Sequence, residues 1–351
     1  MALSVIERIQ LAWLALTQGQ KSVRVATTWE MGQLQSLPVD YATLAGSGYS
    51  RNELVFACIR YIARSAAEAQ MLIMVGKEQE AGAAHPLVKL LAKPNPVMGL
   101  TDLLQTTLVI LNIAGDVYWE KERARNKRDV VALWPMRPDR VKAIPGEYGV
   151  AGYRYELSDG SFRVDYEARD VIHFRYYNPL NEYFGLSPLQ VCARAVDADN
   201  ERSDFTRAFF TNAAVPYGLL TTKQKLIEAE AKRIATRWQE QYGGSENWHR
   251  VAVLDSDITY QRLGLTQQEM AFPDLTALTE SRICTVFGIP PILIGTKFGL
   301  ERATYANMQE ARSAFWQDTM SSILAALTDI MNMSLSPDYN GATIKLDLSN
   351  V

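Results

Sequence analysis

The sequence is poor in the residues that usually carry chemistry or cross-links. Its 351 residues include only three cysteines and three histidines. Cys58, Cys192 and Cys284 are too few and too far apart for a disulfide framework, so we expect small buried side chains in a reducing compartment. No Cys-x-x-Cys or His-x-x-x-His pair occurs, and we therefore predict no metal site.

The motifs of nucleotide-dependent and nucleophilic enzymes are also missing. Gly295-Thr296-Lys297 has residue types of a phosphate-binding loop in the wrong order, and Gly46-Ser47-Gly48 follows no strand-like run. No Gly-x-Ser-x-Gly turn marks a nucleophile. His173 lies in the strand-like run 170–175, where a structural histidine is expected rather than a general base. We predict no catalytic residue, no cofactor and no enzymatic activity.

Long apolar runs and an excess of basic residues are absent as well. No segment reaches the roughly 18 consecutive apolar residues of a membrane span, so no membrane partner is expected. The 36 Lys and Arg against 39 Asp and Glu give a formal net charge of −3. That balance argues against a protein that grips nucleic acid through bulk positive charge.

What the sequence does contain is the composition of a folded protein, with 48% hydrophobic and 21% charged residues. Its length predicts two or more lobes. Residues 1–50 are loosely patterned and are interpreted as an N-terminal arm. Apolar periodicities then predict an α+β lobe. Its expected helices are 52–66, 86–91 and 101–111, and its expected strands are 71–75, 117–121, 130–134, 141–144, 153–157, 162–166 and 171–174.

A basic cluster lies between two of these strands, at Lys121, Arg123, Arg125, Lys127 and Arg128. A phosphate-binding finger is one interpretation of it. Because acidic residues are interleaved, we expect a solvated hairpin tip instead.

The middle of the chain predicts longer helices. One is expected over 189–212, after Pro188, with charges on several faces, which is typical of a strut or a subunit contact. A compact insert follows, with strands at 218–220, 250–254 and 259–263 and a helix over 224–242. A second long helix is expected over 267–287, kinked or restarted near Pro273. The remaining expectations are a loop over 292–304, a helix over 305–333 and a last strand over 344–351.

Short landmarks occur in order along residues 52–348. They are Cys58-Ile59-Arg60, His85-Pro86-Leu87, Pro94-Asn95-Pro96, Gly115-Asp116-Val117-Tyr118, Leu133-Trp134-Pro135, Asp170-Val171-Ile172-His173-Phe174, Gly185-Leu186-Ser187-Pro188-Leu189 and Phe287-Gly288-Ile289-Pro290-Pro291. This series resembles the portal, or head–tail connector, proteins of tailed double-stranded DNA bacteriophages, of the long-tailed-phage type.

The resemblance implies the α+β portal fold of a ring-forming subunit. The implied parts are an N-terminal arm (1–50), a wing (51–186), a first stem helix (187–213), a small α/β clip (214–265), a second stem helix (266–288), a tunnel loop (289–304), and a long helix with the last wing strand (305–351). The sequence stops on that strand, so the crown that usually follows is expected to be absent.

The resemblance also implies a structural function. The subunit would form a dodecameric ring at one capsid vertex, the conduit for genome packaging and ejection, in the virion and, during assembly, in the host cytoplasm. The implied partners are other copies of the chain, double-stranded DNA bound transiently without sequence preference, the large terminase subunit, the head–tail adaptor, and the major capsid and scaffold proteins. Twelve copies at −3 each would carry −36, which suits sliding DNA rather than held DNA.

Three sets of candidate site residues follow. The DNA-facing tunnel loop would use Lys297, Phe298, Glu301 and Arg302. The clip docking surface would use Lys225, Glu228, Lys232, Arg233, Arg237 and Glu240. Subunit contacts in the stem would use Asp197, Asp199, Glu201, Arg202 and Arg207.

Two alternatives stay open at this point. The chain could be the domesticated portal of a prophage or of a gene-transfer particle. It could also be a subunit of a nucleic-acid-processing enzyme, although neither a nucleotide loop nor a carboxylate cluster is visible.

Overall fold

The computed structural model describes residues 41–76, 79–124, 129–147, 149–211, 218–222, 227–242, 258–262, 272–301 and 304–349. Contacts divide the chain into two compact units. The first joins residues 1–193 with 283–351, and the second holds residues 194–282. Most of the predicted arm (1–40) and the predicted strand 250–254 lie outside the described residues.

The last ten residues of the predicted arm are helical. They form α2 (Tyr41–Thr43) and the π-helical segment η1 (Leu44–Ser50), in which Leu44 and Gly48 are buried. Residue 48 approaches the side chain of Leu189, which would lie 3.0 Å from an added Cβ. This part of the arm therefore belongs to the packed structure of the first unit.

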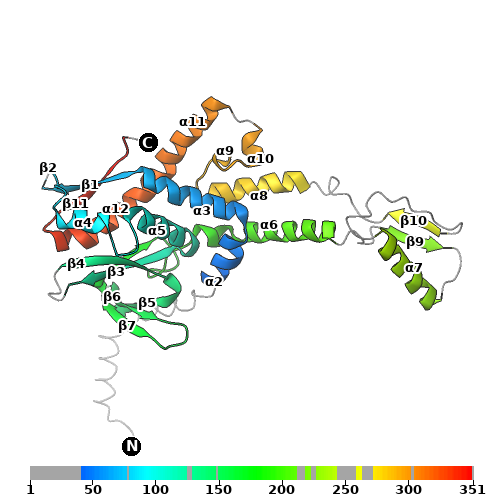
Figure 1. The fold of residues 1–351 in the computed structure, drawn as a ribbon, viewed down its shortest axis with the longest axis horizontal. Coiled ribbons are helices and arrows are strands. Elements are labelled where there is room, and N and C mark those ends of the chain that lie inside the picture. Colours follow the sequence, from blue (N-terminus) through cyan, green and yellow to red (C-terminus); the bar gives the residue numbers. More distant parts are fainter. Residues whose placement is uncertain are drawn as a thin grey trace, which may run out of the picture. The chain divides into compact units, whose positions relative to one another are not determined.

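The helices of the first unit follow the predicted apolar stripes. In α3 (Glu53–Ser65) the stripe Val55, Cys58, Ile59 and Ile62 is buried, and the Asn52 side chain caps the start by accepting from the Val55 N–H at 3.0 Å. The other helices before β3 are η2 (Ala66–Glu68), α4 (Pro86–Ala92) and α5 (Leu100–Ala114). Helices α3 and α5 pack on each other (Figure 1).

The described residues of the first unit also form three antiparallel sheets. The strands are β1 (Gln70–Val75), β2 (Gln79–Glu80), β3 (Asp116–Arg123), β4 (Val130–Met136), β5 (Val141–Gly146), β6 (Gly149–Glu156), β7 (Arg163–Glu167), β8 (Val171–Arg175) and β11 (Thr343–Asp347). Their orders are β4-β3-β8, β5-β6-β7 and β11-β1-β2. Ile73 opposes Ile344, so the end of the chain returns to pair with its first strand. The α+β fold class predicted from the sequence is confirmed.

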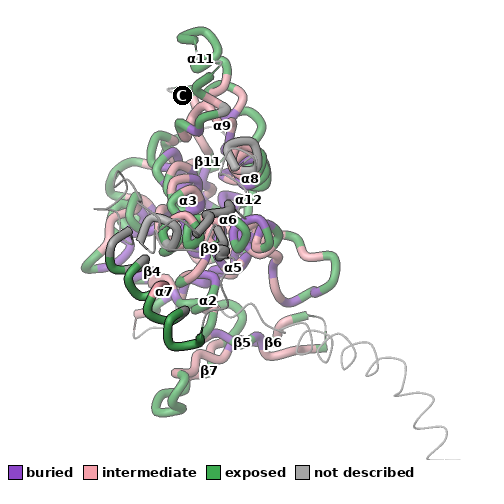
Figure 2. Tube along the Cα trace, turned by 90° about the vertical axis from the view of Figure 1, so that its right-hand side faces the viewer, coloured by how far each residue is buried: buried purple, intermediate pink, exposed green. Residues whose placement is uncertain are grey.

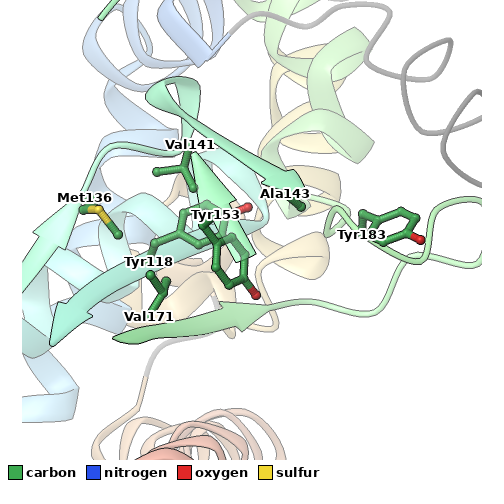
Figure 3. Packing of buried hydrophobic residues seen from close by; sticks show 7 residues of the cluster. All are labelled: Tyr118, Met136, Val141, Ala143, Tyr153, Val171 and Tyr183. Atoms are coloured by element: carbon green, nitrogen blue, oxygen red, sulfur yellow. The ribbon is translucent and has the colours of Figure 1, made fainter. Parts of the chain in front are cut away.

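An apolar cluster joins two of these sheets. It contains Tyr118, Met136, Val141, Ala143, Tyr153, Val171 and Tyr183 (Figure 3). Tyr118 and Val171 come from the sheet of β3, and Val141 and Tyr153 come from the sheet of β5. The short helices η3 (Pro138–Arg140) and η4 (Ala168–Asp170) connect the two sheets. Burial of these side chains fixes the sheets against each other.

The C-terminal part of the first unit differs from the single helix predicted over 305–333. It consists of α11 (Tyr305–Ala314), a π-helical segment η6 (Phe315–Met320), α12 (Ser321–Leu335) and η7 (Ser336–Tyr339). Helix α12 packs on β8 and β11, and Met320, Leu324, Met331 and Leu335 are fully buried. Helix α11 buries no residue and is drawn mostly in the colour of exposed residues in Figure 2.

The second unit contains a two-stranded antiparallel sheet and a helix. Strand β9 (Gly218–Thr222) pairs with β10 (Ile258–Arg262), and α7 (Glu228–Tyr242) lies between them in sequence. Helices α6 (Pro188–Thr211) and α8 (Phe272–Val286) begin and end this part of the chain. Of the helix predicted over 267–287, the described part is α8, which begins at Phe272 beside Pro273; residues 267–271 lie outside the described residues.

The three cysteines are buried, as predicted. The sulfur atoms of Cys58 and Cys284 lie 4.0 Å apart, and their mutual hydrogen bond and burial raise the pKa of the Cys58 thiol. Burial raises the pKa of Cys192 to about 11. The thiols of Cys58 and Cys192 are therefore protonated at neutral pH. Within the described ranges no helix combines the length and apolar character needed to cross a bilayer.

Candidate functional site

The start of α6 is fixed by two of the sequence landmarks, 115–118 and 185–189. Asp116, the first residue of β3, accepts from the Gly185 N–H at 2.8 Å through Oδ2 and lies 2.7 Å from His173 Nε2 through Oδ1. Ser187 donates to the Asn112 and Ile113 carbonyls at 2.9 and 2.7 Å. The Ser187 hydroxyl also accepts from the Gln190 N–H at 3.2 Å and so caps α6.

The close contact between residues 115–118 and 185–189 is called the α6 joint below. Two glycines make it possible. Gly115 ends α5 in the left-handed region with φ 83°, and a Cβ there would lie 2.7 Å from the backbone nitrogen of Ser187. A Cβ on Gly185 would overlap the Gly115 carbonyl oxygen and lie 2.8 Å from its carbonyl carbon. The landmarks therefore meet in space, and backbone contact between them sets the direction in which α6 leaves the sheet.

His173 has a structural environment, as the sequence predicted. Its ring stacks on Tyr118 with centroids 4.3 Å apart, Nε2 faces Asp116, and Nδ1 lies 3.4 Å from the Tyr153 hydroxyl. Both ring nitrogens thus have polar partners close to the α6 joint, Asp116 and Tyr153. In the described part of the chain, no cluster of three or more His, Cys, Asp or Glu residues is arranged to hold a metal ion.

The prediction that the basic cluster forms a solvated hairpin tip is wrong for two of its five residues, Lys121 and Arg123. Lys121 is only 5% exposed and donates to Asp338 Oδ2 and to the Ser334 carbonyl, each at 2.9 Å. Arg123 pairs with Asp170 at 2.6 Å and with Asp338 at 3.0 Å. These cations fasten β3 to the end of α12 rather than facing solvent. Arg125, Lys127 and Arg128 lie outside the described residues.

Asp338 gives this ion-pair cluster a pH dependence. Burial alone would raise the pKa of its carboxyl, but hydrogen bonds and charge from Arg123 and Lys121 outweigh burial and lower it. A lowered folded-state pKa means that the carboxylate stabilises the fold above its unfolded pKa of about 3.9. That contribution is lost as the pH falls through the folded-state pKa.

We expect Asp338→Asn to reduce the free energy of unfolding at pH 7 by about 3 kcal/mol, because the Lys121 ammonium stays buried without its carboxylate. Thermal melts from pH 7 down to pH 3 measure the difference, which should shrink at the acidic end. Asp329→Asn is the control, because Asp329 is exposed on α12 and has no ion pair among the described residues. A difference that stays constant with pH would contradict this account.

Among the described residues 289–301, two short helices occur where the sequence predicts a loop over 292–304. They are α9 (Pro291–Ile294) and α10 (Lys297–Leu300). Thr296 is buried between them, and its hydroxyl donates to the Pro291 carbonyl and accepts from the Gly299 N–H, both at 3.3 Å. A Cβ on Gly299 would lie 2.5 Å from the Ile292 nitrogen. Gly299 therefore serves the close packing of these two helices, because a larger residue would meet the Ile292 backbone.

The four tunnel-loop candidates lie in or beside α10. Lys297 and Glu301 are exposed, and their charged atoms are 3.9 Å apart. Phe298 belongs to α10, and Arg302 lies outside the described residues. Within the described part of this segment, Lys297 and Glu301 thus present one charged pair to solvent.

The stem candidates divide into two groups on α6. Arg202 pairs with Asp199 three residues earlier on the same helix. Asp197, Glu201 and Arg207 are exposed. Two of the five candidates are thus already engaged within the helix, which the residue types alone did not reveal.

The clip candidates lie on α7, except Lys225, which is outside the described residues. Glu228, Lys232, Arg233, Arg237 and Glu240 are all exposed, and Lys232 pairs with Glu228 at 2.8 Å. Ile227, just before the helix, is 70% exposed. Helix α7 therefore presents a wide charged surface.

The chain is similar to known proteins along most of its length. A family model described as "Phage portal protein" matches residues 53–351. An uncharacterized protein of Rickettsia bellii is 26% identical over 311 residues, covering 86% of this chain and 79% of the relative. The portal protein of Enterobacteria phage HK97 is 23% identical over 259 residues, covering 72% of this chain and 59% of the phage protein.

Solved structures are also similar. One, described as the neck of an empty gene transfer agent (GTA) particle computed with C6 symmetry, matches with TM-score 0.70 and 26% identity, covering 90% of this chain and 86% of that one. The neck of a native GTA particle computed with C12 symmetry gives 0.68 and 25%, with 90% and 85% covered. An HK97-family phage portal protein of Corynebacterium diphtheriae gives 0.59 and 13%, with 86% and 94% covered, and shares the fold.

Proposed function

The chain belongs to the phage portal protein family, and we propose that it assembles into a ring that forms the DNA conduit at one vertex of a particle. Members of this family are structural proteins rather than enzymes. The similar GTA neck structures, one described with C12 and one with C6 symmetry, support a closed ring of twelve copies. A ring of identical subunits needs two different faces on each copy, which an elongated helical segment can supply.

The particle that suits this chain best is a gene-transfer particle or a domesticated prophage rather than a free phage. The observation that carries this choice is the 26% identity and TM-score of 0.70 to the GTA neck structure, against 13% and 0.59 for the phage portal protein of Corynebacterium diphtheriae. The relative in Rickettsia bellii, a bacterium, supports the same choice. The phage capsid that the resemblance first implied becomes the second candidate.

Sequencing the nuclease-protected DNA of particles that contain this protein tests the choice. Fragments spread over the host chromosome are expected from a gene-transfer particle. One defined genome, with terminase, protease and capsid genes beside the portal gene, would instead identify a phage or an intact prophage.

Within the ring we assign the segments the roles that the resemblance implied. Residues 51–186 would form the wing, 187–213 and 266–288 the stem, 214–265 the clip and 289–304 the tunnel loop. The clip would dock the large terminase subunit during packaging and the head–tail adaptor afterwards, and the outer part of the ring would meet capsid and scaffold proteins. The joint of Gly115, Asp116, Gly185 and Ser187 supports this division, because it holds the first helix of the stem at the edge of the wing.

The exposed charges of α7 give the motor-docking role a direct test. Arg233→Glu with Arg237→Glu reverses two neighbouring charges and should weaken binding of the purified large terminase subunit about tenfold, by loss of charge complementarity. Lys89→Glu with Lys93→Glu is the matched control, because those lysines are exposed and also four residues apart. Surface plasmon resonance on preformed rings measures both. Equal affinities for the two variants would remove α7 from the docking surface.

A further inference from the structure

Helix α6 carries an apolar edge on its outer face. Val191, Ala198 and Phe205 are seven residues apart, so at 3.6 residues per turn they lie almost in line. All three are exposed, Val191 by 57% and Phe205 by 42%. The buried side of α6, with Cys192, Ala195 and Val196, adjoins this edge, because Ala195 lies four residues from Val191 and three from Ala198. A seven-residue apolar line on an exposed face is the pattern of a helix that packs against another helix.

An acidic strip runs beside this apolar edge. Asp197, Glu201 and Asp204 are exposed and spaced four and three residues apart, so they share one side of the edge. Arg194 is the one basic residue of this face among residues 191–205, which leaves the face with a formal charge of −2. Asp199 and Arg202 pair with each other outside this strip.

Helix α8 has an exposed face of the opposite sign. Leu278, Arg282, Thr285 and Val286 follow the spacing of one helix face, and all four are exposed, Leu278 by 57% and Val286 by 37%. Arg282 is the single charged residue of these four. The outer faces of α6 and α8 (labelled in Figure 1) thus each combine large apolar side chains with charge, acidic on α6 and basic on α8.

We propose that the outer face of α6 in one subunit packs on the outer face of α8 in the next, with Glu201 facing Arg282 across the contact. This inference rests on the proposed ring and names the surfaces that close it. Contact between two copies of the α6 face would set acid against acid, whereas α6 against α8 pairs opposite charges and repeats head to tail. Neither Glu201 nor Arg282 has an ion-pair partner among the described residues, so each is available to a neighbour.

Charge reversal tests the contact. Glu201→Arg and Arg282→Glu, each alone, should raise the protein concentration needed for ring formation at least about tenfold. The double variant should restore rings at the wild-type concentration. Mass photometry over a dilution series measures ring and subunit populations, and thermal melts show that each variant is folded. Glu201→Gln and Arg282→Gln provide milder changes if a reversal lowers stability.

A mixture of the two single variants decides where the contact lies. Equal amounts of Glu201→Arg and Arg282→Glu subunits should form rings, because alternating copies match every α6 face with an α8 face of opposite charge. Restoration in the double variant without restoration in the mixture would place the pair inside one subunit and overturn the proposal. So would single variants that assemble like the surface control Lys89→Glu, which reverses one exposed charge on α4, or no restoration in either case. Wild-type protein that never forms rings would refute the proposed function instead.

Discussion

Gly185→Ala will break the joint at the start of α6 and prevent ring formation. The added methyl group would overlap the Gly115 carbonyl oxygen and lie 3.0 Å from the Tyr176 carbonyl oxygen, and both atoms belong to backbone that cannot rotate away. Relief requires separating the two chain segments, which breaks the hydrogen bond between the Gly185 N–H and Asp116. We expect a loss of about 3 to 5 kcal/mol in the free energy of unfolding.

Gly82→Ala is the matched control for this change. No atom lies within 4 Å of a Cβ added at Gly82, and its φ is ordinary for any residue, so the melting temperature should stay near that of the wild type. Thermal melts and ring yield after gel filtration measure both variants. A Gly185→Ala protein that melts with the control and still forms rings would show that the joint does not set the direction of α6.

Lys297→Glu with Arg302→Glu will impair DNA packaging and leave ring assembly intact. The two reversals change each subunit by −4 charges, and the change repeats in every copy around the channel. Lys297 is exposed on α10, so no buried contact is lost. A channel lined by additional carboxylates repels the phosphates of passing DNA, and we expect the packaged yield to fall roughly tenfold.

Nuclease-protected DNA per particle measures this effect, with ring formation of the purified variant checked in parallel. Lys89→Glu with Lys93→Glu is the control, because it makes the same charge change at exposed positions in α4 and just after its end. A normal DNA yield from the Lys297 and Arg302 variant would remove this loop from the DNA path. An equal loss in the control would attribute the effect to net charge instead.

Local pattern was enough to predict most elements of the fold. The apolar spacing of Leu104, Leu108 and Leu111 predicted α5, and the run 170–175 predicted β8. In both segments the buried residues lie close together in sequence, so the local apolar pattern marks the buried face. The buried cysteines and the structural role of His173 followed from their surroundings in the same way.

Features made by distant residues could not be predicted. Lys121 looked like part of a solvated tip because its partner Asp338 lies 217 positions later in the sequence. The π-helical segment 315–320 leaves no mark in a periodic apolar pattern, and the turn capped by Thr296 depends on contact with Pro291. In each case tertiary contact, rather than local propensity, decides the structure.

The sequence also could not predict which candidate residues of α6 are free to contact a neighbour. Charges on several faces of α6 indicated a helix that meets other surfaces, yet the sequence did not separate Arg202, which pairs with Asp199, from Glu201, which faces outward. That distinction needs the exposed fraction of each side chain. The signal that was available is the seven-residue spacing of Val191, Ala198 and Phe205.

Imaging of the purified protein by negative-stain electron microscopy tests the central claim most directly. The account predicts closed rings with an open axial channel and twelve-fold symmetry in end views. Monomers or small closed dimers under all conditions, at concentrations where the portal contacts should be saturated, would contradict it.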